Sequence, residues 1–277
     1  MQNLNWHDLQ YLPSLTVTNT GDVVADWDRR SAATRAKYPF IADIKYGPHP
    51  REVIDLFRVP GAKATLIYIH GGYWRSFSKV ETSFVVDGFV EQGVSVALIN
   101  YPLCPEVSIG EIRSSIQNAF AHLYKTVLTD DERKSIVVTG HSAGGHLAAL
   151  HLATDWKVFG LPENPIVGVI ALSGVFNVAP LIHTSLNDAL RITETTATIL
   201  NLNTALVRSK AKLVLAVGGD ESEEFHRQTE DQAKAWAELN PETIDLPNIN
   251  HFTIVDSLSD PAGKLHKRAL SLLNSNG

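Results

Sequence analysis

Apolar runs of strand length alternate with longer segments of helical spacing along most of this chain. The strand-like runs occupy residues 53–59, 64–69, 94–100, 136–139, 166–172, 212–217 and, more weakly, 243–246. Helical spacing occupies residues 80–92, 109–127, 143–154, 225–239 and 261–273, and a separate N-terminal helix is expected over residues 22–38. Such alternation is typical of a doubly wound, mainly parallel sheet with helices on both faces. The pattern therefore predicts an α/β protein.

Residues 175–209 interrupt this alternation, because they are long, helical in pattern and placed between two buried strands. In a doubly wound sheet, an insertion at this point lies over the carboxyl ends of the strands, where ligands bind. We therefore expect a small helical insertion that covers a ligand pocket. The chain shows no internal repeat, low-complexity tract or flexible linker. Residues 1–277 are thus predicted to form one domain, in which residues 1–45 are an N-terminal extension.

Composition narrows the class of protein further. The 277 residues are 44% hydrophobic, which is enough for a large buried core. The formal charge of −6 comes without a basic stretch that follows a phosphate backbone, so nucleic acid is not expected as a partner. No apolar run approaches the roughly 18–20 residues that cross a bilayer, and no signal peptide is recognised, so no membrane association is expected. The single cysteine, Cys104, is compatible with a reducing compartment, and a cytoplasmic location is expected.

A Gly-x-Ser-x-Gly motif lies between a predicted strand and a predicted helix. It consists of Gly140-His141-Ser142-Ala143-Gly144 and directly follows the apolar residues 136–139. In a sharp strand-to-helix turn the two glycines let the backbone turn tightly, and the serine hydroxyl is exposed at the tip. The positive end of the following helix then favours a developing oxyanion. So short a motif also occurs by chance in ordinary turns, but the flanking elements supply the context that a nucleophilic serine needs.

A second glycine motif, His70-Gly71-Gly72-Tyr73-Trp74, directly follows the apolar run at residues 64–69. Two adjacent glycines after a buried strand allow backbone N–H groups to point into a cavity, where they stabilise a tetrahedral oxyanion. In hydrolases of this architecture one donor belongs to the residue after the nucleophile, here Ala143, and another comes from such a loop, here Gly71, Gly72 or Tyr73. A plain glycine turn is the alternative, but the serine motif favours an oxyanion hole.

A serine nucleophile needs an imidazole that takes its proton and a carboxylate that orients this imidazole. In hydrolases with a strand–serine–helix turn on a parallel sheet, the chain order is serine, acid, histidine. His251 lies in a polar loop between the last weak strand and the final helix, which suits a general base. His226 lies in a helical segment and His266 on an exposed-looking C-terminal helix, so solvated or capping roles are expected for both.

The acid is expected just after the run at residues 212–217, where Asp220 and Glu221 follow two glycines. Adjacent residues in an extended turn face opposite ways, so only one of the two reaches the imidazole. Pattern alone favours neither, because aspartate is the more frequent acid and glutamate is an accepted variant. Glu223 and Glu224 are expected to be surface charges of the next helix.

Together these motifs resemble one branch of the α/β-hydrolase superfamily, the kynurenine formamidases (arylformamidases) and their bacterial relatives. The similar segments are HGGYW at 70–74, PLIHTSLND at 180–188, ESEEFHRQ at 221–228 and HF at 251–252. They match the HGGxW, PLxxTSxND, acid-SxEFxRQ and HF signatures of that family. The resemblance runs from about Tyr46 to the C-terminus and implies the α/β-hydrolase fold. Aligned without a gap, it places the acid on Glu221, where several members have aspartate, and so ranks Glu221 slightly above Asp220.

The resemblance implies hydrolysis of the amide of an N-acyl aromatic amine, such as N-formylkynurenine or an N-acylanthranilate, through an acyl-enzyme intermediate. It implies no cofactor and no metal, and the expected partner is a small-molecule aromatic amide or ester. The side chains expected to contact this substrate are Tyr73, Trp74, His141 and His183. For Trp74, core packing under the loop is an equal alternative. Arg75, Arg191 and His183 are candidates for binding a substrate carboxylate, although a solvated surface position is the plainer interpretation for each.

Two other functions stay open at this point. A short-chain carboxylesterase uses the same serine, histidine and acid, since cleavage of esters and of activated anilides needs the same groups. A non-catalytic ligand-binding homologue would keep the fold without the chemistry, although the intact serine, histidine and acid argue against it. The sequence does not fix the oligomeric state, and a homodimer is compatible with it.

Overall fold

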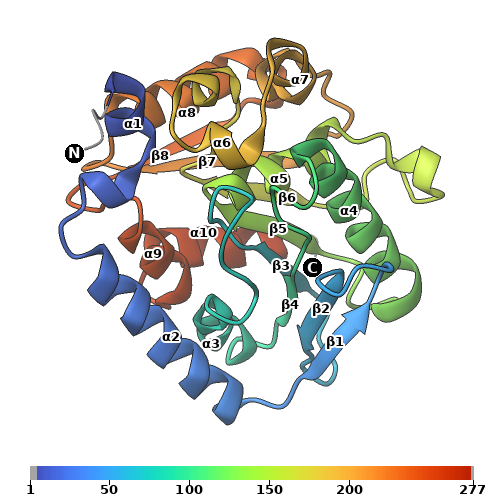
Figure 1. Cartoon of the computed structure of the whole chain (residues 1–277). Coiled ribbons are helices and arrows are strands. Elements are labelled where there is room, and N and C mark those ends of the chain that lie inside the picture. Colours follow the sequence, from blue (N-terminus) through green and yellow to red (C-terminus); the bar gives the residue numbers. More distant parts are fainter. Residues whose placement is uncertain (1–4, 276–277) are drawn as a thin grey trace.

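The sheet predicted from the alternating pattern runs through the middle of the computed structural model, which describes residues 5–275 (Figure 1). It has eight strands among these residues, in the order β1-β2-β4-β3-β5-β6-β7-β8. Neighbours from β4 to β8 pair in parallel, whereas β2 pairs antiparallel with both β1 and β4. The strands are β1 Ile41–Lys45, β2 Val53–Phe57, β3 Thr65–Ile69, β4 Ser95–Ile99, β5 Ile136–His141, β6 Gly168–Leu172, β7 Lys212–Gly218 and β8 Glu242–Leu246.

Seven of these strands were expected from their apolar runs. The residues of β2, β3 and β4 are all buried, as expected for strands covered on both faces. Strand β1 was not anticipated, because its sequence IADIK is largely exposed and has no apolar alternation. It pairs only with β2 at the edge of the sheet, and four of its five residues are exposed. The predicted N-terminal extension therefore contributes a strand to the central sheet.

Helices cover both faces of the sheet and form two separate hydrophobic clusters. One cluster includes Ile116 and Leu147, and the other includes Trp27, Phe89 and Leu265. The longer helices are α2 Thr20–Lys37, α4 Ile109–His122, α5 Ala143–Ala153, α8 Glu223–Ala235 and α10 Lys264–Leu273. The shorter helices are α1 Trp6–Tyr11, α3 Asp87–Val90, α6 Asn187–Leu190, α7 Glu194–Leu200 and α9 Asp256–Ser259. The doubly wound α/β architecture predicted from the sequence is confirmed.

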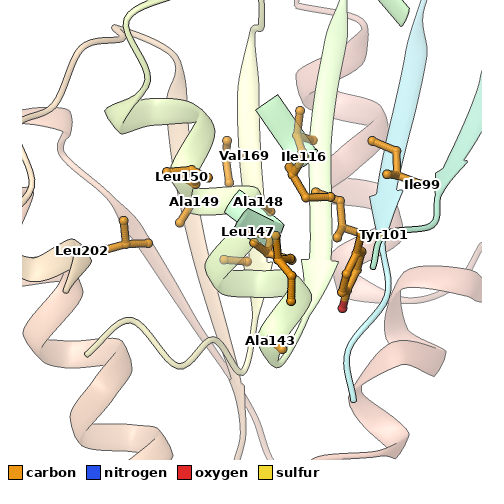
Figure 2. Packing of buried hydrophobic residues seen from close by; sticks show 14 of the residues in the cluster. Ile99, Tyr101, Ile116, Ala143, Leu147, Ala148, Ala149, Leu150, Val169 and Leu202 are labelled. Atoms are coloured by element: carbon orange, nitrogen blue, oxygen red, sulfur yellow. The ribbon is translucent and has the colours of Figure 1, made fainter. Parts of the chain in front are cut away.

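Helix α5 lies at the centre of the first cluster and starts directly after the serine motif. All but the last of its residues are buried, as expected for a helix that is apolar all round. Figure 2 shows Leu147 and Ala148 of this helix beside Ile116 of α4, Val169 of β6 and Tyr101. Tyr101 lies in the loop after β4. This packing fixes the start of α5, and with it the serine that precedes the helix.

Candidate active site

Ser142 stands at a sharp turn between β5 and α5. Its backbone has φ 56° and ψ −118°, a conformation that is costly for a residue with a side chain and that marks functional turns. A Cβ atom on Gly140 would lie 2.2 Å from the main-chain oxygen of Gly144, and a Cβ on Gly144 would lie 2.1 Å from that of Ile69. Neither distance is sterically allowed, so both motif glycines are required by close backbone approach, as the sequence predicted.

His251 and Glu221 form a buried pair on neighbouring loops. The Nδ1 of His251 donates to Oε2 of Glu221 over 2.6 Å. The other carboxylate oxygen, Oε1, accepts the main-chain N–H of Gly218 at 2.7 Å and the hydroxyl of Ser173 at 2.5 Å. The Glu221 side chain has no exposed surface, whereas Asp220 is exposed. Of the two acids left open by the sequence, the structure thus brings Glu221 to the imidazole.

This pairing fixes which nitrogen of His251 faces Glu221. A neutral imidazole with its proton on Nδ1 leaves the Nε2 lone pair free as a proton acceptor. Both His251 and Ser142 line the same cavity, of about 190 Å³. Its wall is formed by Leu12, Pro13, Ser14, Thr20, Val24, Trp27, Gly71, Gly72, Tyr73, Arg75, Ser76, Phe77, Thr82, His141, Ser142, Leu186, His251 and Phe252.

The loop after β3 brings backbone N–H groups beside the serine. A Cβ on Gly71 would lie 3.3 Å from the Cβ of Ser142, so this loop touches the nucleophile turn. Gly72, Tyr73 and Trp74 all have positive φ values, of 97°, 49° and 54°. Within residues 5–275, the N–H groups of Gly72, Tyr73 and Ala143 donate to no other protein group. The predicted oxyanion donors are therefore close to Ser142 and available to a ligand.

Buried polar contacts hold this loop in place. Arg51 donates from Nη2 to the main-chain oxygen of Phe77 at 2.7 Å and from Nε to that of Tyr101 at 2.9 Å. The ring of His70 stacks on that of Tyr101 with a centroid distance of 4.2 Å, and its Nδ1 donates to the main-chain oxygen of Gly71 at 2.8 Å. Burial lowers the pKa of His70 to about 3, so this imidazole stays neutral and supports the loop without transferring protons.

The four predicted substrate-contacting side chains divide into two pairs. Tyr73 and His141 line the cavity. Trp74 is fully buried and packs edge-on against His146 with a centroid distance of 5.5 Å, because consecutive positive φ values turn its side chain under the loop into the core. His183 is exposed and lies beside His7 with a centroid distance of 4.9 Å. Neither Trp74 nor His183 lines the cavity that contains Ser142.

The cavity is covered mainly by the N-terminal segment. Leu12, Pro13, Thr20, Val24 and Trp27 contribute to its wall, whereas the insertion at residues 175–209 contributes only Leu186. Contrary to the expectation, the insertion therefore forms little of the cover, since it packs chiefly against α1, α8, α5 and α4. The sequence marked residues 22–38 as a helix but carried no local signal for where this helix docks. Phe77 and Phe252 are further wall residues that sequence reasoning did not assign.

A buried polar cluster anchors the N-terminal segment to α8. Tyr11 donates from its hydroxyl to Glu224, whose carboxylate also accepts from Arg227 at 2.6 Å. The hydroxyl of Ser222 donates to the main-chain oxygen of Gln10 at 2.6 Å. Glu224 is therefore a buried member of this cluster, and its interpretation as a surface charge is corrected. A helix that buries a carboxylate needs a partner for it, and Arg227, three residues along the helix, supplies one.

The other two late histidines lie away from the cavity. His266, expected on an exposed helix, is almost completely buried and donates from Nδ1 to the main-chain oxygen of Leu258 at 3.0 Å. The short helix α9 covers the face of α10 that carries this residue, and no sequence pattern predicted this contact. His226 lies in α8, as expected, and does not line the cavity.

Metal-binding clusters and membrane spans are both absent from the part of the chain that the structure describes. Residues 5–275 contain no group of three or more histidine, cysteine, aspartate or glutamate side chains that could hold a metal ion. Over the same range, no helix has both the length and the apolar character needed to span a bilayer.

The sheet order, the serine turn after β5 and the histidine–carboxylate pair beyond β7 and β8 define an α/β-hydrolase. The BD-FAE family model matches residues 55–212, which is more than half of the chain. Kynurenine formamidases from Salmo salar and Danio rerio are 31% and 28% identical to it, each over 84% of this chain and 81% and 82% of the relative. The chain therefore belongs to the BD-FAE family and to the kynurenine formamidase family of α/β-hydrolases, and is a hydrolase.

A solved structure has the same fold. A candidate thioesterase from Silicibacter sp. TM1040 superposes with a TM-score of 0.82 at 29% sequence identity, covering 94% of this chain and 95% of that one. The fold is therefore shared over nearly the whole length.

Proposed function

We propose that this protein hydrolyses the amide bond of an N-acyl aromatic amine with a formyl or short acyl group, such as N-formylkynurenine or an N-acylanthranilate. The observation that carries the proposal is the His251–Glu221 pair at 2.6 Å, whose imidazole lines the same cavity as Ser142. The similarity to two kynurenine formamidases over 84% of the chain supports this substrate class.

The proposed reaction has two halves. Ser142 attacks the acyl carbon while Nε2 of His251 takes its proton, and Glu221 stabilises the imidazolium that forms. His251 then gives this proton to the departing aniline nitrogen, which leaves an acyl group on Ser142. In the second half His251 activates a water molecule, which releases the acid and restores the serine.

The negative charge on the acyl oxygen needs donors during both halves. The N–H group of Ala143 starts α5, whose N-terminal end carries a partial positive charge. The unpaired N–H groups of Gly72 and Tyr73, within the described residues, complete the set. In comparable hydrolases, loss of one such donor costs about 3 kcal/mol of transition-state stabilisation.

The walls of the cavity suit a flat aromatic leaving group. Trp27, Phe77 and Phe252 contribute aromatic rings to it, and Trp27 lies 6.1 Å and 6.2 Å from the other two by ring centroids. Aromatic side chains bind an aryl ring through offset or edge contacts. A volume of about 190 Å³ accommodates one such ring and a short acyl chain.

A short-chain carboxylesterase activity is the second candidate, because ester cleavage needs the same serine, histidine and acid. The similar solved structure is named a candidate thioesterase. Purified protein should be tested with N-formylkynurenine, an N-acylanthranilate and p-nitrophenyl acetate. A preference for the ester above ~100-fold in kcat/KM, about 2.7 kcal/mol, would overturn the proposed substrate class.

Labelling with a fluorophosphonate probe tests the nucleophile itself. We expect the wild type and Ser114→Ala to be labelled, since Ser114 is an exposed residue of α4. Ser142→Ala should stay unlabelled. Labelling of Ser142→Ala would assign the nucleophile elsewhere, and an absence of labelling in all three proteins would favour a ligand-binding role.

A further inference from the structure

Arg75 is the one permanently charged side chain in the cavity wall among the residues that the structure describes. The wall contains two histidines and several hydroxyls, but no lysine, aspartate or glutamate within that part of the chain. The Arg75 guanidinium makes no ion pair and no hydrogen bond within residues 5–275. A cation on the wall of a cavity that holds no carboxylate is available to bind an anion from outside the protein.

Most other donors of the wall are already used inside the protein. The hydroxyls of Thr20, Ser76 and Thr82 each donate to a main-chain oxygen nearby. The hydroxyl of Tyr73 donates to the main-chain oxygen of Tyr11. Among the described residues, hydrogen bonding to a ligand away from Ser142 is therefore left largely to Arg75 and to the exposed hydroxyl of Ser14.

The indole N–H of Trp27, another residue of the wall, is not accessible to a ligand in the cavity. This residue is only 2% exposed, and its Nε1 has no hydrogen-bond partner in the described part of the chain. Because this N–H has almost no accessible surface, a charged ligand in the cavity is expected to bind Arg75 instead.

The backbone places Arg75 in a fixed relation to the proposed oxyanion donors. The main-chain N–H of Arg75 donates to the main-chain oxygen of Gly72 at 3.0 Å. Two residues after Arg75, the main-chain oxygen of Phe77 accepts a hydrogen bond from Arg51. Arg75 therefore belongs to the same tight turn as Gly72 and Tyr73. An anion bound by the Arg75 side chain would therefore lie at a fixed position relative to the acyl group at Ser142.

We propose that Arg75 binds a carboxylate of the substrate and makes the enzyme select acyl-aryl amides that carry an acidic group over neutral ones. This inference rests on the proposed function and names the substrate class within it. Guanidinium and carboxylate pair through two parallel hydrogen bonds, which fix orientation as well as charge. Because Arg75 is exposed at the mouth, the selectivity should decrease as ionic strength rises.

Binding to the Ser142→Ala protein tests the inference without turnover. N-formylanthranilate and formanilide differ by one carboxylate, and their dissociation constants can be compared by calorimetry. We expect the acid to bind at least ~10-fold more tightly. Adding Arg75→Gln should bring the two constants within about twofold, and Arg75→Lys should keep part of the preference because it keeps the charge.

Arg208→Gln on the same Ser142→Ala background is the matched control, since Arg208 is exposed and lies outside the cavity wall. It should leave the preference unchanged. Equal constants for the acid and the neutral amide, or a preference that survives Arg75→Gln, would overturn the inference.

The two proposals fail in different ways. Hydrolysis of both amides by the wild type, together with equal dissociation constants, would reject the role of Arg75 but not the proposed reaction. If the preference for the acid depends on Arg75 but the wild type hydrolyses neither amide, the anion site is supported and the proposed reaction is rejected.

Discussion

His141 donates a hydrogen bond from Nε2 to the main-chain oxygen of His251 over 2.7 Å. His141 ends β5 directly before Ser142, so this bond ties the strand of the proposed nucleophile to the loop of the proposed base. Burial lowers the pKa of His141 well below its ordinary value, so the ring stays neutral and has a single N–H to donate. The residue between the first glycine and the serine of the motif thus has a positioning role.

His141→Phe should lower kcat about tenfold, because it keeps a ring of similar size but removes the donor that fixes His251. KM should change less than kcat, since the cavity wall keeps an aromatic surface. Kinetics on the preferred substrate, with urea unfolding of both proteins, check this expectation. A rise in KM with unchanged kcat would instead assign His141 to substrate binding.

Glu221→Gln should lower kcat by about 10³–10⁴, because an amide cannot hold the correct tautomer of His251 or stabilise its cation. Asp220→Asn is the matched control, since Asp220 precedes Glu221 in the chain and its side chain is exposed. This control should retain nearly all activity. Steady-state kinetics of both variants distinguish the roles, and the reverse ranking would move the acid to Asp220.

Gly72→Ala should remove most activity. Gly72 has φ +97°, and an added Cβ would lie 2.3 Å from the main-chain oxygen of Ser76. The loop must move, which displaces a proposed oxyanion donor, and we expect a loss of at least ~100-fold in kcat. Gly61→Ala is the control, because Gly61 also has a positive φ, +76°, but has open space around it.

The control separates backbone strain from loss of the donor. Gly61→Ala should lower the free energy of unfolding by about 1 kcal/mol and leave kcat unchanged. Similar kcat losses in both variants, measured at a temperature where both are folded, would contradict the role of Gly72.

Acid should destabilise the fold through its buried histidines. Burial lowers the pKa of His146 to about 3 and that of His151 to about 4, from an ordinary value of 6.5. Below pH 6.5 the unfolded chain takes up protons that the folded protein does not, so the free energy of unfolding falls as pH decreases. At about pH 5 each of these histidines should account for a loss of ~2 kcal/mol, and above about pH 6.5 for almost none.

His151→Gln isolates one of these contributions. Its free energy of unfolding, measured in urea at about pH 7 and about pH 5, should fall by ~2 kcal/mol less than that of the wild type between the two values. An equal fall in both proteins would show that His151 is not responsible.

The sequence predicted the parts of the site whose requirements are local. The Ser142 turn needs glycines on both sides, and the loop at Gly71 and Gly72 must approach the serine turn closely, so residue types alone mark them. The positions of strands β2 to β8 follow from the alternation of apolar runs. His251 and the acid could be narrowed to a few residues because they must follow particular strands.

The sequence did not predict contacts that depend on docking between distant segments. Trp27 carries no motif, yet it becomes a wall of the cavity because α2 packs across the loop after β3. Ser173 reaches Glu221 only because β6 and β7 are neighbours in the sheet. The burial of Glu224 depends in the same way on Tyr11, more than two hundred residues earlier in the chain.

The hydroxyl of Tyr73 binds the main-chain oxygen of Tyr11, and Tyr11 in turn rests on α8. During synthesis the segment around Tyr11 leaves the ribosome first, whereas α8 is made only near the end of translation. A nascent chain therefore carries its serine turn, and even the glycine loop, with one side open to water or to any chaperone that holds it. The cavity is therefore completed only when the N-terminal segment, which is synthesised first, packs onto α8, which is synthesised near the end.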